Sequence, residues 1–269
     1  MSLADFSIVG FFAGTVILVA LSIEVGYRLG RRAHRRSQEE KESPVSAIEG
    51  SVLALLAFIL AFTFGIASDR FDSRKELVRA EANAVRTAWH RSDFLAEPER
   101  TETKALLRQY VFDRASAFQS ADAERVEHVI EEAERIQEHL WSLALVHAHR
   151  DMNSDVAALY IESLNEMAAV HASRVAIGVQ ARIPIGIWFT LAVLTFLGMS
   201  LVGYQAGLAE SKRTLAMPVL ALAFASVVAL ISSLDQPVSG FTLTTVSQQP
   251  MIDLLADIDK HRIVMSGER

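Results

Sequence analysis

One apolar stretch of the sequence carries side chains at every fourth position that could act together. They are Ala54, Phe58, Phe62 and Ile66. In a helix this spacing places all of them on one face. Several copies of this face around an axis would form a hydrophobic constriction, which can gate ions by dewetting. Taken alone, the pattern favours the simpler interpretation that these side chains face lipid or a neighbouring helix.

Charged residues flank this stretch on both sides. Glu49 precedes it, and Asp69, Arg70 and Asp72 follow it. Rings of such charges at the mouths of a constriction would bias the sign of the ion that passes. A charge at the end of a membrane helix also reaches the interface at little cost, so a solvated border is the default interpretation.

The other reactive residue types form no catalytic or metal-binding pattern. The chain has no cysteine, and none of its eight histidines lies in a Glu-x-x-His or His-Glu-x-x-His pattern. It has no glycine-rich phosphate loop and no Gly-x-Ser-x-Gly elbow. The net charge of −6 gives no electrostatic footprint for nucleic acid. We expect no enzyme activity, cofactor, metal site or nucleic-acid partner.

Four charge-free apolar runs are long enough to cross a lipid bilayer as helices. They cover residues 6–23, 50–68, 183–209 and 214–234, and a span needs about 20 residues. The first run follows Asp5 rather than a basic segment, which indicates a retained span and not a cleaved signal peptide. The sequence therefore predicts an all-α multi-pass membrane protein with four transmembrane helices.

The charged middle of the chain predicts a helical bundle outside the membrane, inserted between transmembrane helices 2 and 3. It is rich in Ala, Glu, Arg and Leu, which favour helix. We expect helices near 70–95, 98–118, 122–149 and 154–182. The first should be continuous with span two, and the last should run into span three, interrupted at most by Pro184. Caps are expected at 120–122 and 151–155. Apolar stripes led by Val126 and Leu159 should form the core of this bundle.

The predicted organisation has four parts. Transmembrane helices 1 and 2 with a basic loop occupy 1–69, and the extramembrane helical domain occupies 70–182. Transmembrane helices 3 and 4 occupy 183–235. A polar segment and a short amphipathic helix with Ile252, Leu254, Leu255 and Ile258 occupy 236–269. This helix could dock against the domain or against lipid headgroups.

Small residues indicate where the spans touch one another. Gly10 and Gly14 form one Gly-x-x-x-Gly pair. Further small residues recur on spans three and four, at Gly198, Gly203, Gly207, Ala221, Ala225 and Ala229.

The short loops between spans predict an orientation in the cell membrane. The first carries Arg28, Arg31, Arg32, Arg35, Arg36 and Lys41, and the second carries Lys212 and Arg213. The positive-inside bias places both loops in the cytoplasm. The termini and the helical domain would then be extracytoplasmic.

Several short motifs resemble the bestrophin-like domain family of prokaryotic membrane proteins. They are LALLAFILAFTF at 53–64, DRFD at 69–72, EANA at 81–84, LNEM at 164–167, SLDQP at 233–237 and SQQP at 247–250. Bestrophins are pentameric anion channels whose second span lines an apolar neck, so the resemblance implies that Ala54, Phe58, Phe62 and Ile66 line the pore. It also implies the inverse orientation, with the termini and the helical domain in the cytosol.

Two hypotheses of different class follow. In the first, the protein is a homo-oligomeric ion channel for inorganic anions, with Glu49, Asp69, Arg70 and Asp72 at the pore mouths. In the second, it is a non-conducting membrane scaffold or envelope sensor whose helical domain binds a partner.

Overall fold

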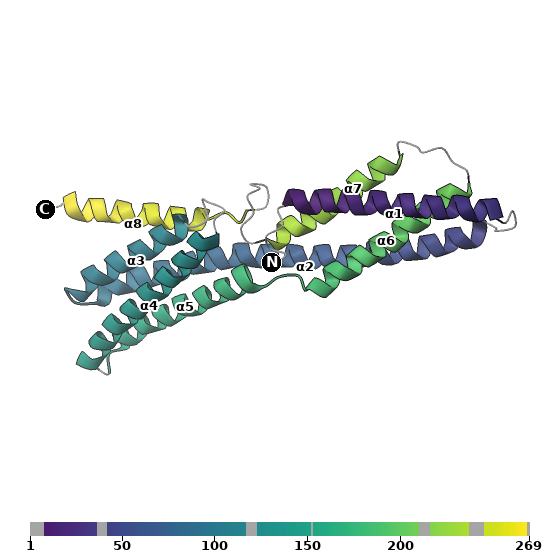
Figure 1. Ribbon diagram of the computed structural model, residues 1–269. Helices are drawn as coiled ribbons and strands as arrows, with labels where there is room; N and C mark the ends of the chain where they lie inside the picture. The colour runs from purple at the N-terminus through teal and green to yellow at the C-terminus, as the bar shows by residue number, and fades with distance from the viewer. Residues whose placement is uncertain are drawn as a thin grey trace. The chain divides into compact units, whose positions relative to one another are not determined.

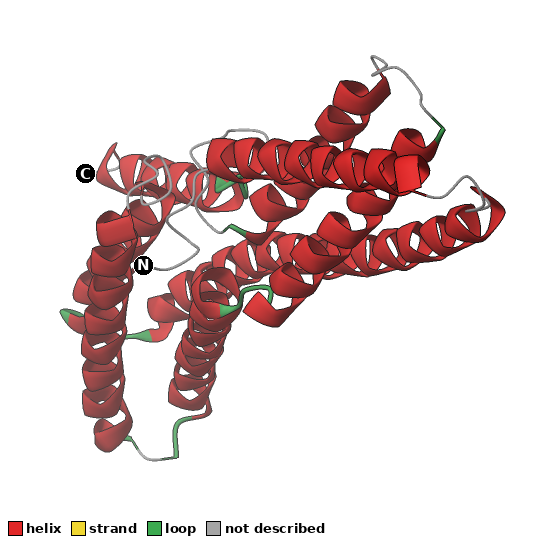
Figure 2. Cartoon of the chain, turned by 45° about the vertical axis from the view of Figure 1, so that its right-hand side comes forward, coloured by secondary structure: helices red, strands yellow, loops and turns green. Residues whose placement is uncertain are grey.

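The computed structural model describes residues 8–36, 42–116, 123–151, 153–209, 216–236 and 245–267. Nearly all of these residues are helical, and Figure 2 draws helices and loops but no strand in the described ranges. In chain order the helices are α1 (Ile8–Arg36), α2 (Glu42–Arg91), α3 (Glu99–Ser116), α4 (Ala123–Arg150), α5 (Asp155–Val175), α6 (Ile185–Leu208), α7 (Ala216–Asp235) and α8 (Gln249–Gly267) (Figure 1). Two short helices, η2 (Ser92–Phe94) and η4 (Ala176–Gln180), follow α2 and α5. The all-α prediction is confirmed.

Within the described ranges, four helices are long and apolar enough to cross a membrane. They are Ile8–Arg35, Val45–Phe94, Ile185–Leu208 and Met217–Asp235, which contain the apolar parts of the four predicted spans. Some of the predicted features lie outside the described residues. They are Lys41, the loop with Lys212 and Arg213, the cap at 120–122 and most of the polar segment after Gln236.

The helix α2 is continuous through the end of the second apolar run, as predicted. It has 50 residues, which corresponds to a length of about 75 Å. Its only proline, Pro44, lies in the first turn, where a helix needs no backbone N–H donor. One helix therefore supplies both a membrane span and the first helix of the polar domain.

The prediction of a second such helix, running from 154 into span three, is wrong. The chain forms the π-helix η4 after α5, and residues 181–184 are non-helical before α6 begins at Ile185. Pro184 disfavours helical backbone at Ile183. The Ile183 N–H instead donates to the Asp235 carboxylate at 3.0 Å.

The helices of the polar domain otherwise begin close to their predicted starts. The helix α3 begins one residue after Pro98. The Ser154 hydroxyl accepts a hydrogen bond from the Ala157 N–H at 3.2 Å and caps α5. This bond satisfies one of the free amides of the first turn.

Contacts divide the chain into two compact units. The first contains 1–70 and 182–244, and the second contains 71–181 and 245–269. The helix α2 contributes its first part to the first unit and its last part to the second.

In the first unit, α1 packs against α6 through glycines on both helices. A Cβ atom at Gly26 or Gly30 would clash with the carbonyl oxygens of Ser200 or Tyr204, and one at Gly203 would clash with that of Ile23. The two backbones are thus too close for any side chain. A Cβ atom at Gly14 would meet only open space, so the predicted Gly10–Gly14 pair makes no such approach at Gly14.

The helix α7 completes this packing with its small residues. Ala221, Ala225 and Ala229 are all buried. Ala221 joins Val19, Ile23 and Met199 in a small apolar cluster. The predicted small-residue face of the fourth span is therefore a packing face.

The second unit has a larger apolar core to which five helices contribute. Its members include Val85 of α2, Leu107 of α3, Leu140 of α4, Met167 of α5 and Leu254 of α8. Most of the predicted stripe that begins at Val126 is buried, while Trp141 and Leu159 are exposed.

The C-terminal helix docks on this second unit. Met251, Leu254 and Ile258 are buried in its core, whereas Ile252 is exposed. Arg108 of α3 donates to Asp259 at 2.7 Å. The sequence left open whether this helix docks against the helical domain or against lipid headgroups. In the structure α8 packs against the helical domain.

The close approach of α1 and α6 leads to a stability prediction. We expect Gly203→Ala to lower stability by about 1–3 kcal/mol, because the added methyl group must push two backbones apart. Thermal unfolding of the detergent-solubilised protein, followed by size-exclusion chromatography, measures the loss. Gly14→Ala adds the same methyl group into open space and should leave the midpoint unchanged; equal midpoints for both variants would contradict the packing.

Candidate functional site

The predicted pore stripe lies on an exposed face of α2. Phe58 and Phe62 are 58% and 60% exposed, and their rings stack in a tilted pair with centroids 4.7 Å apart. Ala54 is also exposed and Ile66 is half-buried. Leu56, Thr63 and Ala67 on the other side of the helix are buried. A single chain therefore leaves this aromatic pair free to meet lipid, a neighbouring copy or a pore.

The predicted mouth charges differ in their surroundings. Glu49 is half-buried and Asp69 is exposed. Asp72 is exposed and accepts a hydrogen bond from Lys75 at 3.1 Å. Asp69 and Asp72 are three residues apart, so they share one side of α2.

Arg70 is half-buried and takes part in a cluster centred on the buried Asp235. The Arg70 guanidinium lies 3.3 Å from the Asp235 carboxylate at the end of α7. Arg182 donates to the backbone carbonyl of Asp235 at 2.8 Å, and Ile183 donates to its side chain. Asp235 is only 7% exposed, so this carboxylate joins α2, α7 and the non-helical segment that precedes α6 within the first unit.

A second buried cluster in the polar domain centres on Glu81 of α2, which has no exposed surface. Its carboxylate bonds to two arginines: Arg114 of α3 at 3.0 Å and Arg174 of α5. Both arginines are almost completely buried. A buried carboxylate is stable only with such charged partners.

Tyr110 and His171 complete the second cluster. The Tyr110 hydroxyl donates to Glu81 at 2.5 Å and lies 3.2 Å from Nδ1 of His171. Because its only hydrogen is used on Glu81, the hydroxyl must accept from His171, which therefore carries a hydrogen on Nδ1. The imidazole is oriented by this bond, with its Nε2 atom 4.0 Å from Glu134.

The charges in this cluster fix the ionisation of Glu81. Burial by itself raises the pKa of the carboxyl group, but Arg174 and Arg114, with the hydrogen bonds from His171 and Tyr110, hold that pKa well below 4.5. Glu81 is therefore ionised in the folded protein over the whole physiological pH range.

The two clusters bring together motifs that are distant in the sequence. Arg174 also donates to Gln248 at 2.6 Å, so it joins the 81–84 motif to the 247–250 motif. In the same way, Arg70 joins the 69–72 motif to the 233–237 motif. These motifs stand out in the sequence, whereas the roles of Tyr110, Arg114, His171 and Arg174 were not predicted from it. For His171 and Arg174 the sequence does contain an indication of burial, because both are polar residues on an otherwise apolar face of a helix. They continue the line of buried positions formed by Leu164 and Met167 along α5.

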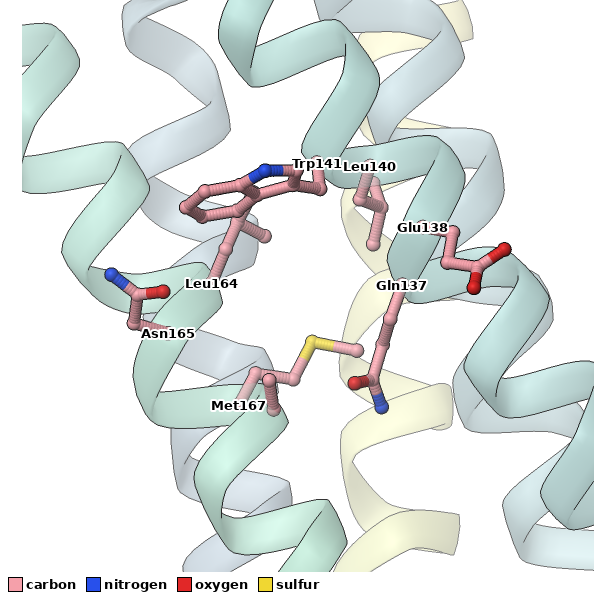
Figure 3. A pocket seen from close by; sticks show the side chains of 8 residues that line it. Gln137, Glu138, Leu140, Trp141, Leu164, Asn165 and Met167 are labelled. Atoms are coloured by element: carbon pink, nitrogen blue, oxygen red, sulfur yellow. The ribbon is translucent and has the colours of Figure 1, made fainter.

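A cavity of about 290 Å³ lies between α4 and α5. Figure 3 shows Trp141 and Leu140 on one side and Leu164, Asn165 and Met167 on the other. Among the described residues that line it, Glu138 is the only titratable one. The lining suits an apolar group and offers no pair of residues for acid–base chemistry.

The sequence and the fold both match a known family. The bestrophin-like domain matches residues 13–251. A crystal structure of a variant bacterial bestrophin homologue from Klebsiella pneumoniae is 16% identical, with a TM-score of 0.63, and covers 94% of this chain and 99% of that chain. A second variant of that homologue is 17% identical, with a TM-score of 0.63 and coverages of 97% and 99%. No protein of curated function matches this sequence.

Four apolar helices and a helical extramembrane unit define a multi-pass membrane protein of the fold found in bacterial bestrophin homologues. The chain belongs to the bestrophin-like domain family, whose match extends over most of its length.

The cluster around Glu81 predicts a large and pH-dependent stability effect. Glu81→Gln leaves two buried arginines without their carboxylate, and we expect a loss of about 3–5 kcal/mol. The pKa of Glu81 is lower in the folded state, so its contribution is present above pH 4.5 and is lost as pH falls below that value. Chemical unfolding at several pH values measures both effects.

The control is Glu131→Gln, because Glu131 is exposed. It should change stability by less than about 0.5 kcal/mol. A Glu81→Gln protein that shows the same acid-dependent decline as the wild type would remove Glu81 from this explanation.

Proposed function

We propose that the protein is a homo-oligomeric ion channel of the bestrophin type, in which α2 lines an apolar neck. The main observation in support of this proposal is the exposed Phe58–Phe62 pair on a membrane-spanning helix of a bestrophin-like chain. One chain contributes one such helix, and one helix cannot enclose a pore. A ring of copies is therefore required, and the family resemblance favours five.

The proposed neck consists of Ala54, Phe58, Phe62 and Ile66. A ring of these apolar side chains would hold back water and ions until it widens. Glu49 would lie at one mouth, with Asp69, Arg70 and Asp72 at the other. Since the Arg70 guanidinium also holds Asp235, its role at the mouth would be partly structural.

We propose inorganic anions as the permeant ions. Family membership is the main support for this choice. The edge of a phenyl ring carries partial positive charge, so rings placed edge-on to the axis would attract an anion that has lost part of its water. Asp69 and Asp72 are exposed, so the surrounding salt solution would screen them and they would weaken this preference only locally.

Conductance of the purified protein in planar bilayers tests the neck. We expect chloride-selective currents in a chloride gradient, and Phe58→Ala with Phe62→Ala should raise the unitary conductance at least about twofold by widening the constriction. Phe189→Ala on α6 is the matched control, since Phe189 is 69% exposed and lies outside the proposed pore.

Two results would overturn the channel proposal. One is a monomeric native mass in detergent, and the other is the absence of current under varied pH, calcium and membrane tension. A silent oligomer would favour the alternative, a non-conducting scaffold whose helical domain binds a partner.

We further propose that the loop after α1 lies in the cytoplasm and the helical domain outside it. The support is the group of arginines at the end of α1. Because the chain lacks cysteine, single introduced cysteines report topology without background. An impermeant maleimide on intact cells should label the Ala105→Cys variant in α3 and not the Ser46→Cys variant at the start of α2. The reverse pattern would place the helical domain in the cytosol, which is the orientation implied by the resemblance to bestrophins.

A further inference from the structure

We infer that the polar end of α1 binds the headgroup of an anionic phospholipid, whose acyl chain lies along the same helix face. The residues concerned are Arg28, Arg31, Arg32 and Arg35, here called the arginine face. They are spaced three and four apart and follow the apolar part of the helix. This inference needs a membrane-embedded chain and does not depend on ion conduction.

The arginine face lines a hollow of about 350 Å³ together with Glu24 and Tyr27. All four arginines are exposed. Glu24 pairs with Arg28 at 2.7 Å, and the Arg31 guanidinium lies over the Tyr27 ring at 5.9 Å. Four cations thus face one carboxylate in this hollow, which leaves an excess of positive charge.

The excess charge has the chemistry that recognises phosphate. A guanidinium group presents paired N–H donors that match two phosphate oxygens, and it is less strongly hydrated than an ammonium group. The arginine face is also not used for packing, because Gly26 and Gly30 on the opposite side of α1 contact α6.

The apolar surface next to the hollow selects a lipid over a free phosphate ion. Ile17 and Leu21 precede the arginines on the same side of α1 and are 58% and 59% exposed. Gly14, further along this side, has open space around its Cα. An amphiphile with an anionic head and an apolar tail complements the charged and the apolar parts together, whereas phosphate complements only the first.

Native mass spectrometry of the full-length protein tests this assignment. The protein is incubated in detergent with equal amounts of phosphatidylglycerol and phosphatidylcholine of identical acyl chains. We expect phosphatidylglycerol adducts to dominate on the wild type. The Arg31→Gln, Arg35→Gln double variant should lower the phosphatidylglycerol preference about tenfold, because each basic residue adds to the attraction for an anionic headgroup.

Two further variants separate the site from general charge. Arg125→Gln with Arg135→Gln removes the same charge from exposed positions on α4 and should leave the lipid preference unchanged. Arg31→Lys with Arg35→Lys keeps the charge but not the planar donor pair, and should give an intermediate preference.

Three outcomes would overturn the inference. In the first, the glutamine variant at Arg31 and Arg35 keeps the wild-type ratio of the two lipids. In the second, it changes the number of subunits without changing the bound lipid, which would make this face a contact between copies. In the third, millimolar inorganic phosphate displaces phosphatidylglycerol, which would show that the headgroup alone is recognised.

Discussion

Backbone hydrogen bonding within hydrocarbon is the constraint on which the structure depends. A segment that crosses a bilayer must satisfy its own N–H and C=O groups, and α2 does so over 50 residues without an interior proline. The same helix carries the Phe58–Phe62 pair into the first unit and Glu81 into the second. The register of one helix therefore decides which side chains the membrane part exposes and which the polar domain buries.

Two buried carboxylates hold together segments that are far apart in the chain. Asp235 bonds to Arg70 and to the Ile183 amide, and Glu81 bonds to Arg114 and Arg174. Burying either carboxylate without its charged or hydrogen-bonding partners would cost free energy of folding. Each carboxylate and its partners must therefore be present together. This requirement gives a physical reason for the polar residues of the short motifs at 69–72, 81–84, 233–237 and 247–250 to occur together in this chain.

The sequence predicted what depends on local pattern and length. The four apolar runs, the unbroken α2 and the Ser154 cap need only hydropathy, the absence of breakers and a capping hydroxyl. The break before α6 was underestimated, because the effect of Pro184 on Ile183 became decisive only where Asp235 could accept the freed amide. That bond joins residues 52 positions apart, and no local pattern reports it.

The clusters at the candidate site were beyond prediction for the same reason. Glu81 and Arg114 resemble ordinary charged residues of amphipathic helices, and only the packing of three helices shows that they are buried together with Arg174. The glycine contact was half predicted: Gly203 and Gly207 were expected to approach a neighbour, whereas Gly26 and Gly30 of α1 were not identified as that neighbour.

The backbone contact between α1 and α6 has a consequence for how such a protein can change over evolution. Gly26, Gly30 and Gly203 meet main-chain atoms rather than side chains, so the spacing of the two helices is set by groups that every residue possesses. Substitutions on the lipid-exposed surface can accumulate without shifting this pair. A membrane scaffold of constant geometry can in this way persist among relatives that share few residues, while the exposed helix faces diversify for different tasks.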